Sequence, residues 1–196
     1  MTALKAAGVE PEWVQVGNET ASGMIYPEGS TNNWGQLAQL INKGYDAVKA
    51  VSPKSKVILH IDQGNNNKRF QTWFDNARAN GAKYDVIGLS YYPFWLPGNP
   101  DYKLSIDDLG ANLNDMAARY GKEVMVVEVG GEDFKVVNTY DMLVAVQKKV
   151  KAVPDAKGLG VMYWEPQGAR SWSKYGLSAW GENGRPTMAL DAFLVD

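Results

Sequence analysis

The chain has 196 residues, of which 45% are hydrophobic and 21% are charged, and its net charge is -2. This composition is typical of one soluble globular domain and provides no basic face for nucleic acid. The absence of cysteine excludes disulfides and thiolate metal sites, and no apolar run approaches the roughly 20 residues of a membrane span.

The first residues have the pattern of the end of a helix. Leu4 and Ala7 share one helix face, and Gly8 is suited to the position just after a helix. The segment lacks the charged-then-apolar layout of a signal peptide. We therefore expect the chain to begin within a helix that precedes its first strand.

Five short apolar runs come next along the chain, each bounded by turn residues, at positions 13–19, 56–62, 85–93, 123–130 and 160–166. Because these runs are continuous rather than alternating, they predict parallel strands that are covered on both faces. Helical patterns lie between and after them, at positions 34–51, 68–80, 106–120, 138–153 and 188–194.

This alternation is typical of two α/β architectures, a doubly wound open sheet and a (β/α)8 TIM barrel. Each predicted strand ends in polar or aromatic residues, and only in a barrel do all strand ends meet at one mouth, which favours the barrel. A barrel needs eight units. We therefore expect residues 1–196 to form the last five units of a single truncated barrel domain, with two exposed strand edges that favour pairing with another chain.

Two glutamates stand at predicted strand ends, Glu19 after "WVQVGN" and Glu128 within "MVVEVG". Glycoside hydrolases use such a pair, one carboxyl group to protonate the leaving oxygen and the other to attack the sugar carbon or activate water. A retaining mechanism places them roughly 5 to 5.5 Å apart. Taken singly, a glutamate at a strand end is more often a solvated group or a partner of a helix N-cap, so the hypothesis depends on the pair.

Neighbouring side chains offer groups for binding a sugar. Asn18 can donate to a sugar hydroxyl, and Tyr91 or Tyr92 can hold the carboxylate of the nucleophile in its ionised form. Trp95 and Trp164 present flat apolar faces for sugar rings, with core filling as the alternative.

His60 is the only histidine in the chain, which excludes a triad or zinc site with a second one. It is either a hydrogen-bonding group at the mouth or a buried histidine with its partners satisfied. Asp62 either orients a substrate or caps the following turn. We predict neither a metal ion nor another cofactor.

The motifs "WVQVGNE", "ILHIDQG", "DVIGLSYYPFW", "VVEVG" and "GVMYWEP", in this order, resemble the endo-beta-1,4-galactanases of glycoside hydrolase family 53. The resemblance implies a barrel that cleaves beta-1,4-galactan, the arabinogalactan side chain of pectin, or galacto-oligosaccharides, with retention of configuration. It implies Glu19 as the acid/base, Glu128 as the nucleophile and Asn18 next to the scissile bond. The cleft residues that it implies are His60, Asp62, Tyr91, Trp95 and Trp164.

The resemblance also implies a secreted, periplasmic or cell-surface parent protein, because the substrate is a polymer. Some bacterial members bind calcium after the nucleophile, and the short loop "VGGEDFKVVNTYD" argues against that ion here. Two alternatives remain: a retaining barrel glycosidase for another beta-linked glycan, and a non-catalytic barrel fragment that self-associates. We expect these residues alone to be weakly active or inactive, because misplacement by about 1 Å can cost about 100-fold in rate. We expect no nucleic acid or membrane partner.

Overall fold

The computed structural model describes residues 1–195, in which five parallel strands form one sheet in the order β1-β2-β3-β4-β5. The strands are β1 Trp13–Gln15, β2 Lys56–Ile61, β3 Val86–Tyr91, β4 Glu123–Val129 and β5 Gly158–Tyr163. Each strand pairs with the next one along the chain, which is barrel topology, whereas a doubly wound sheet reverses its strand order at a switch point. The prediction of a partial barrel is therefore confirmed.

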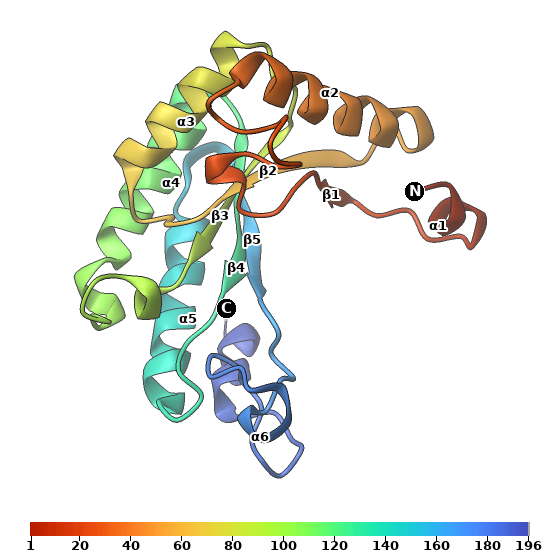
Figure 1. Ribbon diagram of the computed structural model, residues 1–196. Coiled ribbons are helices and arrows are strands. Elements are labelled where there is room, and N and C mark those ends of the chain that lie inside the picture. Colours follow the sequence, from red (N-terminus) through yellow and green to blue (C-terminus); the bar gives the residue numbers. More distant parts are fainter. Residues whose placement is uncertain (196) are drawn as a thin grey trace.

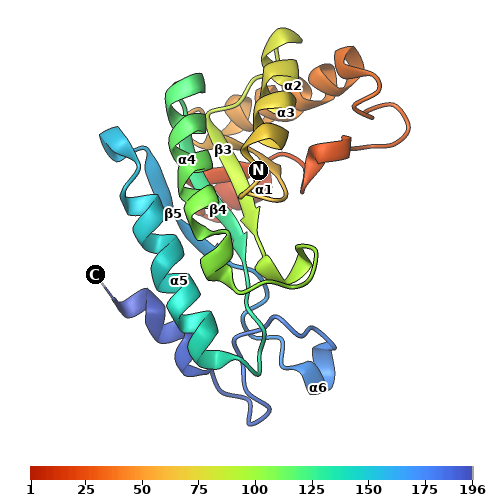
Figure 2. The ribbon, with the colours of Figure 1, turned by 90° about the vertical axis from the view of Figure 1, so that its left-hand side faces the viewer.

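Four long helices lie on one side of the sheet (Figures 1 and 2), and they are α2 Trp34–Val51, α3 Asn67–Ala79, α4 Ile106–Tyr120 and α5 Val136–Lys151. Their bounds agree with the predicted helices to within two residues. The predicted helix at 188–194 is instead a 3-10 helix, η5 Met188–Leu194, which lies against α5. A short helix, α6 Arg170–Ser173, precedes it.

The first helix, α1 Thr2–Ala6, stands apart from the other helices beside β1 (Figure 1). Gly8 follows it with φ +76°, a left-handed value that glycine adopts without strain, as the predicted helix end requires. The Lys5 ammonium donates to the Val51 carbonyl oxygen at 2.6 Å. This contact links α1 to the C-terminal end of α2.

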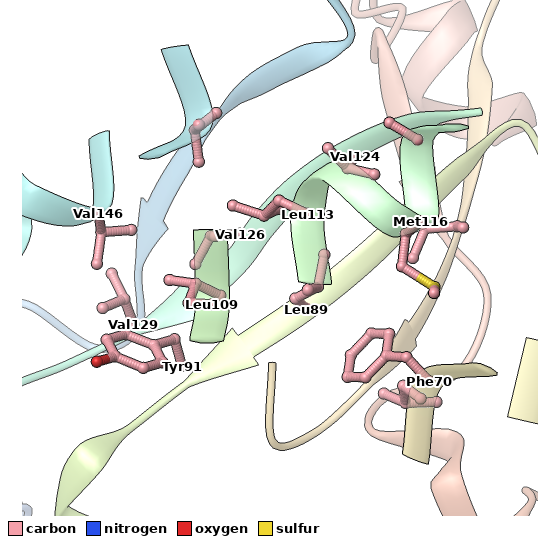
Figure 3. Close-up of a cluster of buried hydrophobic side chains, with 14 of the residues drawn as sticks. Phe70, Leu89, Tyr91, Leu109, Leu113, Met116, Val124, Val126, Val129 and Val146 are labelled. Atoms are coloured by element: carbon pink, nitrogen blue, oxygen red, sulfur yellow. The ribbon is translucent and has the colours of Figure 1, made fainter. Parts of the chain in front are cut away.

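The main core lies between the sheet and the four helices, and Figure 3 shows its central part. Leu89 and Val126 from the strands meet Leu113 and Met116 of α4, and all four side chains are fully buried. Burial of each such side chain contributes roughly 1.5–3 kcal/mol. This packing holds the strands in register and so positions the residues at their ends.

The opposite face of the sheet carries a smaller buried cluster, formed by Ile58, Val86, Met125 and Val127. The three central strands are almost entirely buried, as predicted, whereas β1 and β5 are partly exposed. Met162 of β5, for example, is 44% exposed. Coverage of both faces is thus confirmed for the central strands and is wrong for the two edge strands.

Candidate active site

Glu19 lies in a turn after β1, so the predicted strand at 13–19 is shorter than expected. Gly17 has φ +80° and Glu19 has φ +44°, left-handed values that an extended strand does not contain. The fully buried Thr20 anchors this turn. Its hydroxyl donates to the His60 carbonyl oxygen at 3.0 Å, and its carbonyl oxygen accepts from the Trp73 indole at 3.0 Å. Thr20 therefore holds Glu19 against β2 and α3.

Glu128 reaches the inner face of the sheet because β4 contains a bulge. Leu89 pairs with Val126, but the next residue, Ser90, pairs with Glu128, so Val127 is an extra residue in β4. Val126 packs on the helix side and Val127 on the inner side. Strict alternation would then return Glu128 to the helix side, and the bulge turns it inward instead.

Both glutamates line one cavity of about 370 Å³. Most of its residues end a strand or directly follow one, which is the position of the active site in barrel enzymes. The complete lining is Glu19, Asp62, Gln63, Asn65, Ser90, Tyr92, Trp95, Leu96, Glu128, Trp164 and Tyr175. Trp95 is 68% exposed and Trp164 is 50% exposed, so these indoles present apolar surface to the solvent and do not fill the core.

His60 lies behind the two carboxyl groups and is fully buried. Its Nδ1 accepts from the Glu19 backbone N–H at 3.4 Å, and its Nε2 lies 2.6 Å from the Ser90 hydroxyl. Burial lowers the pKa of His60 to about 4, although nearby Asp62 opposes this effect. The ring is therefore neutral near pH 7, and its 4.0 Å approach to Glu128 Oε1 is not an ion pair.

The Glu128 carboxyl group holds its proton more strongly than an ordinary glutamate. Burial, and then the charge of Glu19, raise the pKa of Glu128 from 4.5 to about 7. The Tyr92 hydroxyl donates to Glu128 Oε2 at 3.3 Å and opposes that shift. Burial and its neighbours Tyr175 and Glu128 raise the pKa of Tyr92 far above its ordinary value, so Tyr92 remains a donor.

This pKa shift predicts a pH-dependent cost in stability. Between about pH 4.5 and 7 the folded state keeps the Glu128 proton that the unfolded chain has lost, so stability falls as the pH rises through this window and levels off above it. Glu128→Gln removes that titration. We expect the free energy of unfolding of the variant to exceed that of the wild type by about 1–3 kcal/mol at pH 8 and to equal it near pH 4.

Urea unfolding at a series of pH values measures this difference, with the exposed Glu28→Gln as the matched control. The control should follow the wild-type curve at every pH. A Glu128→Gln curve that also runs parallel to the wild-type curve from pH 4 to pH 8 would contradict the prediction.

The other predicted binding residues divide into two groups. Asp62, Trp95 and Trp164 line the cavity, and Asp62 also forms an ion pair with Arg69 at 2.6 Å. His60 lies beneath the cavity, and the exposed Asn18, whose Oδ1 accepts from Gln15, is absent from its lining. Neither residue is part of the cavity lining, because Asn18 is exposed and bound to Gln15, and His60 is buried and accepts the Glu19 backbone N–H.

Tyr91 does not line the cleft, and this prediction is wrong. Its side chain is fully buried in the main core, near Val129 and Leu109 (Figure 3). Its hydroxyl lies 2.9 Å from Ser105 Oγ and donates to the Tyr102 carbonyl oxygen. The strand alternation that directs Tyr91 to the helices directs the next residue, Tyr92, to the cavity.

Sequence reasoning missed several cavity residues. Gln63 and Asn65 closely follow β2 in "HIDQGNNN", so the strand-end position that indicated Asp62 is a signal for them as well. Ser90 is also detectable, because it alternates with the apolar Leu89 within β3. Tyr175 comes from the loop after α6, where no periodic pattern indicates its position.

The sequence model described as "Glycosyl hydrolase family 53" matches residues 1–135 and 131–193. The chain belongs to glycosyl hydrolase family 53. An arabinogalactan endo-beta-1,4-galactanase from Humicola insolens is 31% identical over 85% of the chain, and an uncharacterised protein from Niallia circulans is 32% identical over 91%. The matched segments cover 55% and 56% of those relatives, so this family 53 chain spans about half of their length.

Two solved structures share the fold of this chain. A fungal beta-1,4-galactanase structure superposes on the whole chain with a TM-score of 0.86 at 26% identity, and 65% of that chain is covered. The catalytic domain of a family 53 protein from Ignisphaera aggregans has a TM-score of 0.84 at 22% identity, with 97% of this chain and 60% of that one covered. The second likeness shows the fold alone.

The described part of the family 53 chain, residues 1–195, has no group of three or more His, Asp or Glu side chains that could hold a metal ion. Within the same residues, no helix combines the length and apolar character that crossing a membrane requires.

Proposed function

We propose that this chain carries the catalytic carboxyl pair of an endo-acting, retaining glycoside hydrolase that cleaves beta-1,4-galactan. The observation that carries the proposal is that Glu19 and Glu128, 109 positions apart in the sequence, line one cavity together with two exposed tryptophans. Family membership supports the reaction class, and curated relatives named arabinogalactan endo-beta-1,4-galactanases support the substrate. The galactan side chains of pectin belong to this substrate class, and we propose them as a substrate.

In the proposed mechanism Glu19 donates its proton to the glycosidic oxygen as the bond from that oxygen to the anomeric carbon breaks. A carboxylate oxygen of Glu128 forms a bond to the anomeric carbon at the same time. Water then attacks that carbon and gives its proton to Glu19, and the bond to Glu128 breaks. The exposed position of Glu19 suits contact with a leaving group, and the deeper Glu128 suits attack from the opposite side of the sugar.

The coupling between the two carboxyl groups supports these roles. In the free protein the charge of Glu19 helps to keep the proton on Glu128, whose pKa is about 7. When Glu19 carries the proton instead, that charge disappears and the Glu128 carboxylate becomes easier to form. The Tyr92 hydroxyl then stabilises it as the nucleophile. One proton shared by the pair is therefore sufficient for the first step.

The test uses a completed barrel, in which residues 1–196 are joined to three further β/α units from the Humicola insolens relative. We expect it to release oligosaccharides from galactan and to act far more slowly on mannan or cellulose. Proton NMR of the first product should show the retained anomer. Faster cleavage of mannan or cellulose would replace the proposed substrate with another beta-linked glycan, and an inverted product would refute the retaining mechanism.

Residues 1–196 alone should show little or no cleavage, because part of the cleft wall is absent around the carboxyl pair. Strong turnover by this chain alone would contradict that expectation.

Because the proposed substrate is a polymer, we also propose that the parent protein acts outside the cytoplasm, as a secreted, periplasmic or cell-surface enzyme.

The partly exposed edge strands β1 and β5 predict self-association of residues 1–196. Unpaired strand edges favour pairing between chains, and Met162 adds exposed apolar surface on β5. We expect light scattering to show oligomers at micromolar concentrations and Met162→Lys to shift the population toward monomers. The control is Leu104→Lys, which changes a more exposed residue, at 76%, outside the sheet. A monomeric wild type, or equal effects of the two variants, would contradict the prediction.

A further inference from the structure

Three residues around the end of the sheet form a closed ring of hydrogen bonds. The Glu19 backbone N–H donates to His60 Nδ1 at 3.4 Å, and His60 Nε2 lies 2.6 Å from Ser90 Oγ. The Ser90 hydroxyl donates to Glu19 Oε1 at 2.6 Å and thereby closes the ring. His60 is 0% exposed and Ser90 is 1% exposed, so water competes weakly for the bond between them, whereas the two bonds to Glu19 are only partly buried.

The three hydrogen bonds of this ring all run in the same direction, from donor to acceptor. Because Nδ1 of His60 accepts the backbone N–H, the neutral imidazole carries its proton on Nε2. Nε2–H therefore donates to Ser90 Oγ, and the Ser90 hydroxyl has its own proton available for the Glu19 carboxylate. A neutral His60 agrees with burial, which lowers its pKa to about 4. The backbone of Glu19 thus orients the group that binds its own side chain.

We propose that Ser90 is a positioning residue for Glu19, whose hydroxyl holds Oε1 so that Oε2 is the oxygen that carries the proton during glycoside cleavage. This inference rests on the proposed function. Ser90 does not touch the reacting atoms, because its hydroxyl is occupied between His60 and Glu19. Ser90 therefore selects which of the two Glu19 oxygens faces the glycosidic oxygen.

Other titratable groups also face Glu19, and a test must distinguish their influence on its carboxyl group from that of Ser90. Glu128 lies on the neighbouring strand β4, and Asp62, Tyr92 and Tyr175 line the same cavity. Ser90→Ala leaves all four in place and removes one hydroxyl group. Ser90→Thr restores a hydroxyl at the same position. The matched control is Ser105→Ala, which removes a buried hydroxyl that meets the neutral Tyr91 phenol instead of a carboxylate.

NMR of residues 1–196 with labelled His ring nitrogens and Glu carboxyl carbons tests the ring without requiring hydrolysis. We expect wild-type His60 to show the Nε2–H tautomer from pH 5 to pH 8. In Ser90→Ala the Glu19 carboxyl signal should change, because Oε1 loses its hydrogen bond. Ser90→Thr should return the signal toward its wild-type position, and Ser105→Ala should leave it unchanged.

An Nδ1–H tautomer in the wild type would overturn the inference, as would a Glu19 signal that is the same in folded Ser90→Ala and in the wild type. If Ser90→Ala does not fold, the wild-type tautomer decides the question alone. The proposed function is tested separately: a completed barrel that does not cleave galactan refutes that function, whereas the NMR result still decides whether Ser90 orients Glu19.

Discussion

Glu128→Gln in the completed barrel is expected to lower kcat on galactan by about 1,000-fold or more. The amide is nearly the same size as the carboxyl group and still accepts the Tyr92 hydrogen bond, but it cannot form the covalent bond to the sugar. Reducing-end release from galactan measures the loss. Normal cleavage by this variant would exclude Glu128 as the nucleophile.

Glu19→Gln separates the two roles. We expect a loss of about 100- to 10,000-fold on galactan, because the leaving oxygen is no longer protonated. On an aryl galactoside whose leaving group needs no proton, Glu19→Gln should keep the first step, visible as a burst of phenolate, whereas Glu128→Gln should show none. The control Glu28→Gln should behave as the wild type. A burst in Glu128→Gln and none in Glu19→Gln would reverse the assignment.

The pH effect on stability and this loss of activity concern the same carboxyl group. Burial and the charge of Glu19 raise the pKa of Glu128, so its ionised form costs free energy in the folded protein. Glu128→Gln is therefore expected to be inactive and, at pH 8, more stable than the wild type. This combination distinguishes a functional charge from a structural one, whose removal would weaken the fold.

Phe74→Ala is expected to lower the free energy of unfolding by about 3–5 kcal/mol. Phe74 is fully buried on α3, and its ring contacts those of Trp73 at 4.8 Å, Tyr84 at 5.4 Å, Tyr120 at 5.8 Å and Phe70 at 6.1 Å between centroids. Truncation leaves a cavity that these rigid rings cannot fill. Urea unfolding monitored by circular dichroism measures the change.

The matched control is Phe134→Ala, because Phe134 is 67% exposed. It should cost less than about 1 kcal/mol. Phe74→Ala should also disturb the turn that carries Glu19, since α3 carries the Trp73 indole that binds the Thr20 carbonyl oxygen beside Glu19. A Phe74→Ala protein as stable as Phe134→Ala would show that the aromatic cluster is not essential to the core.

The order of the elements and the site residues that follow the strands were predictable, because both depend on patterns of a few neighbouring residues. Continuous apolar runs separated by helical periodicity predicted parallel strands in barrel order, and the α2 and α4 boundaries agree with the predicted ranges. Polar residues at strand ends predicted that Glu19, Asp62 and Glu128 lie together. Alternation within β3 also decides between the two tyrosines that the sequence offered as partners of the carboxylate: Leu89 and Tyr91 face the helices, and Ser90 and Tyr92 face the cavity.

By itself, the sequence determined the five strand–helix units, their barrel architecture and the two glutamates at strand ends, because hydrophobic periodicity and strand polarity are local properties of the chain. Only the tertiary structure decided which way Glu128 points, since the bulge at Val127 appears only when β4 pairs with β3. It likewise decided that His60 is buried behind the carboxyl groups, bound to Ser90 and Glu19. Pairing register and burial depend on residues that are distant in the sequence. Register and burial in turn set the orientation and the charge of the carboxyl pair.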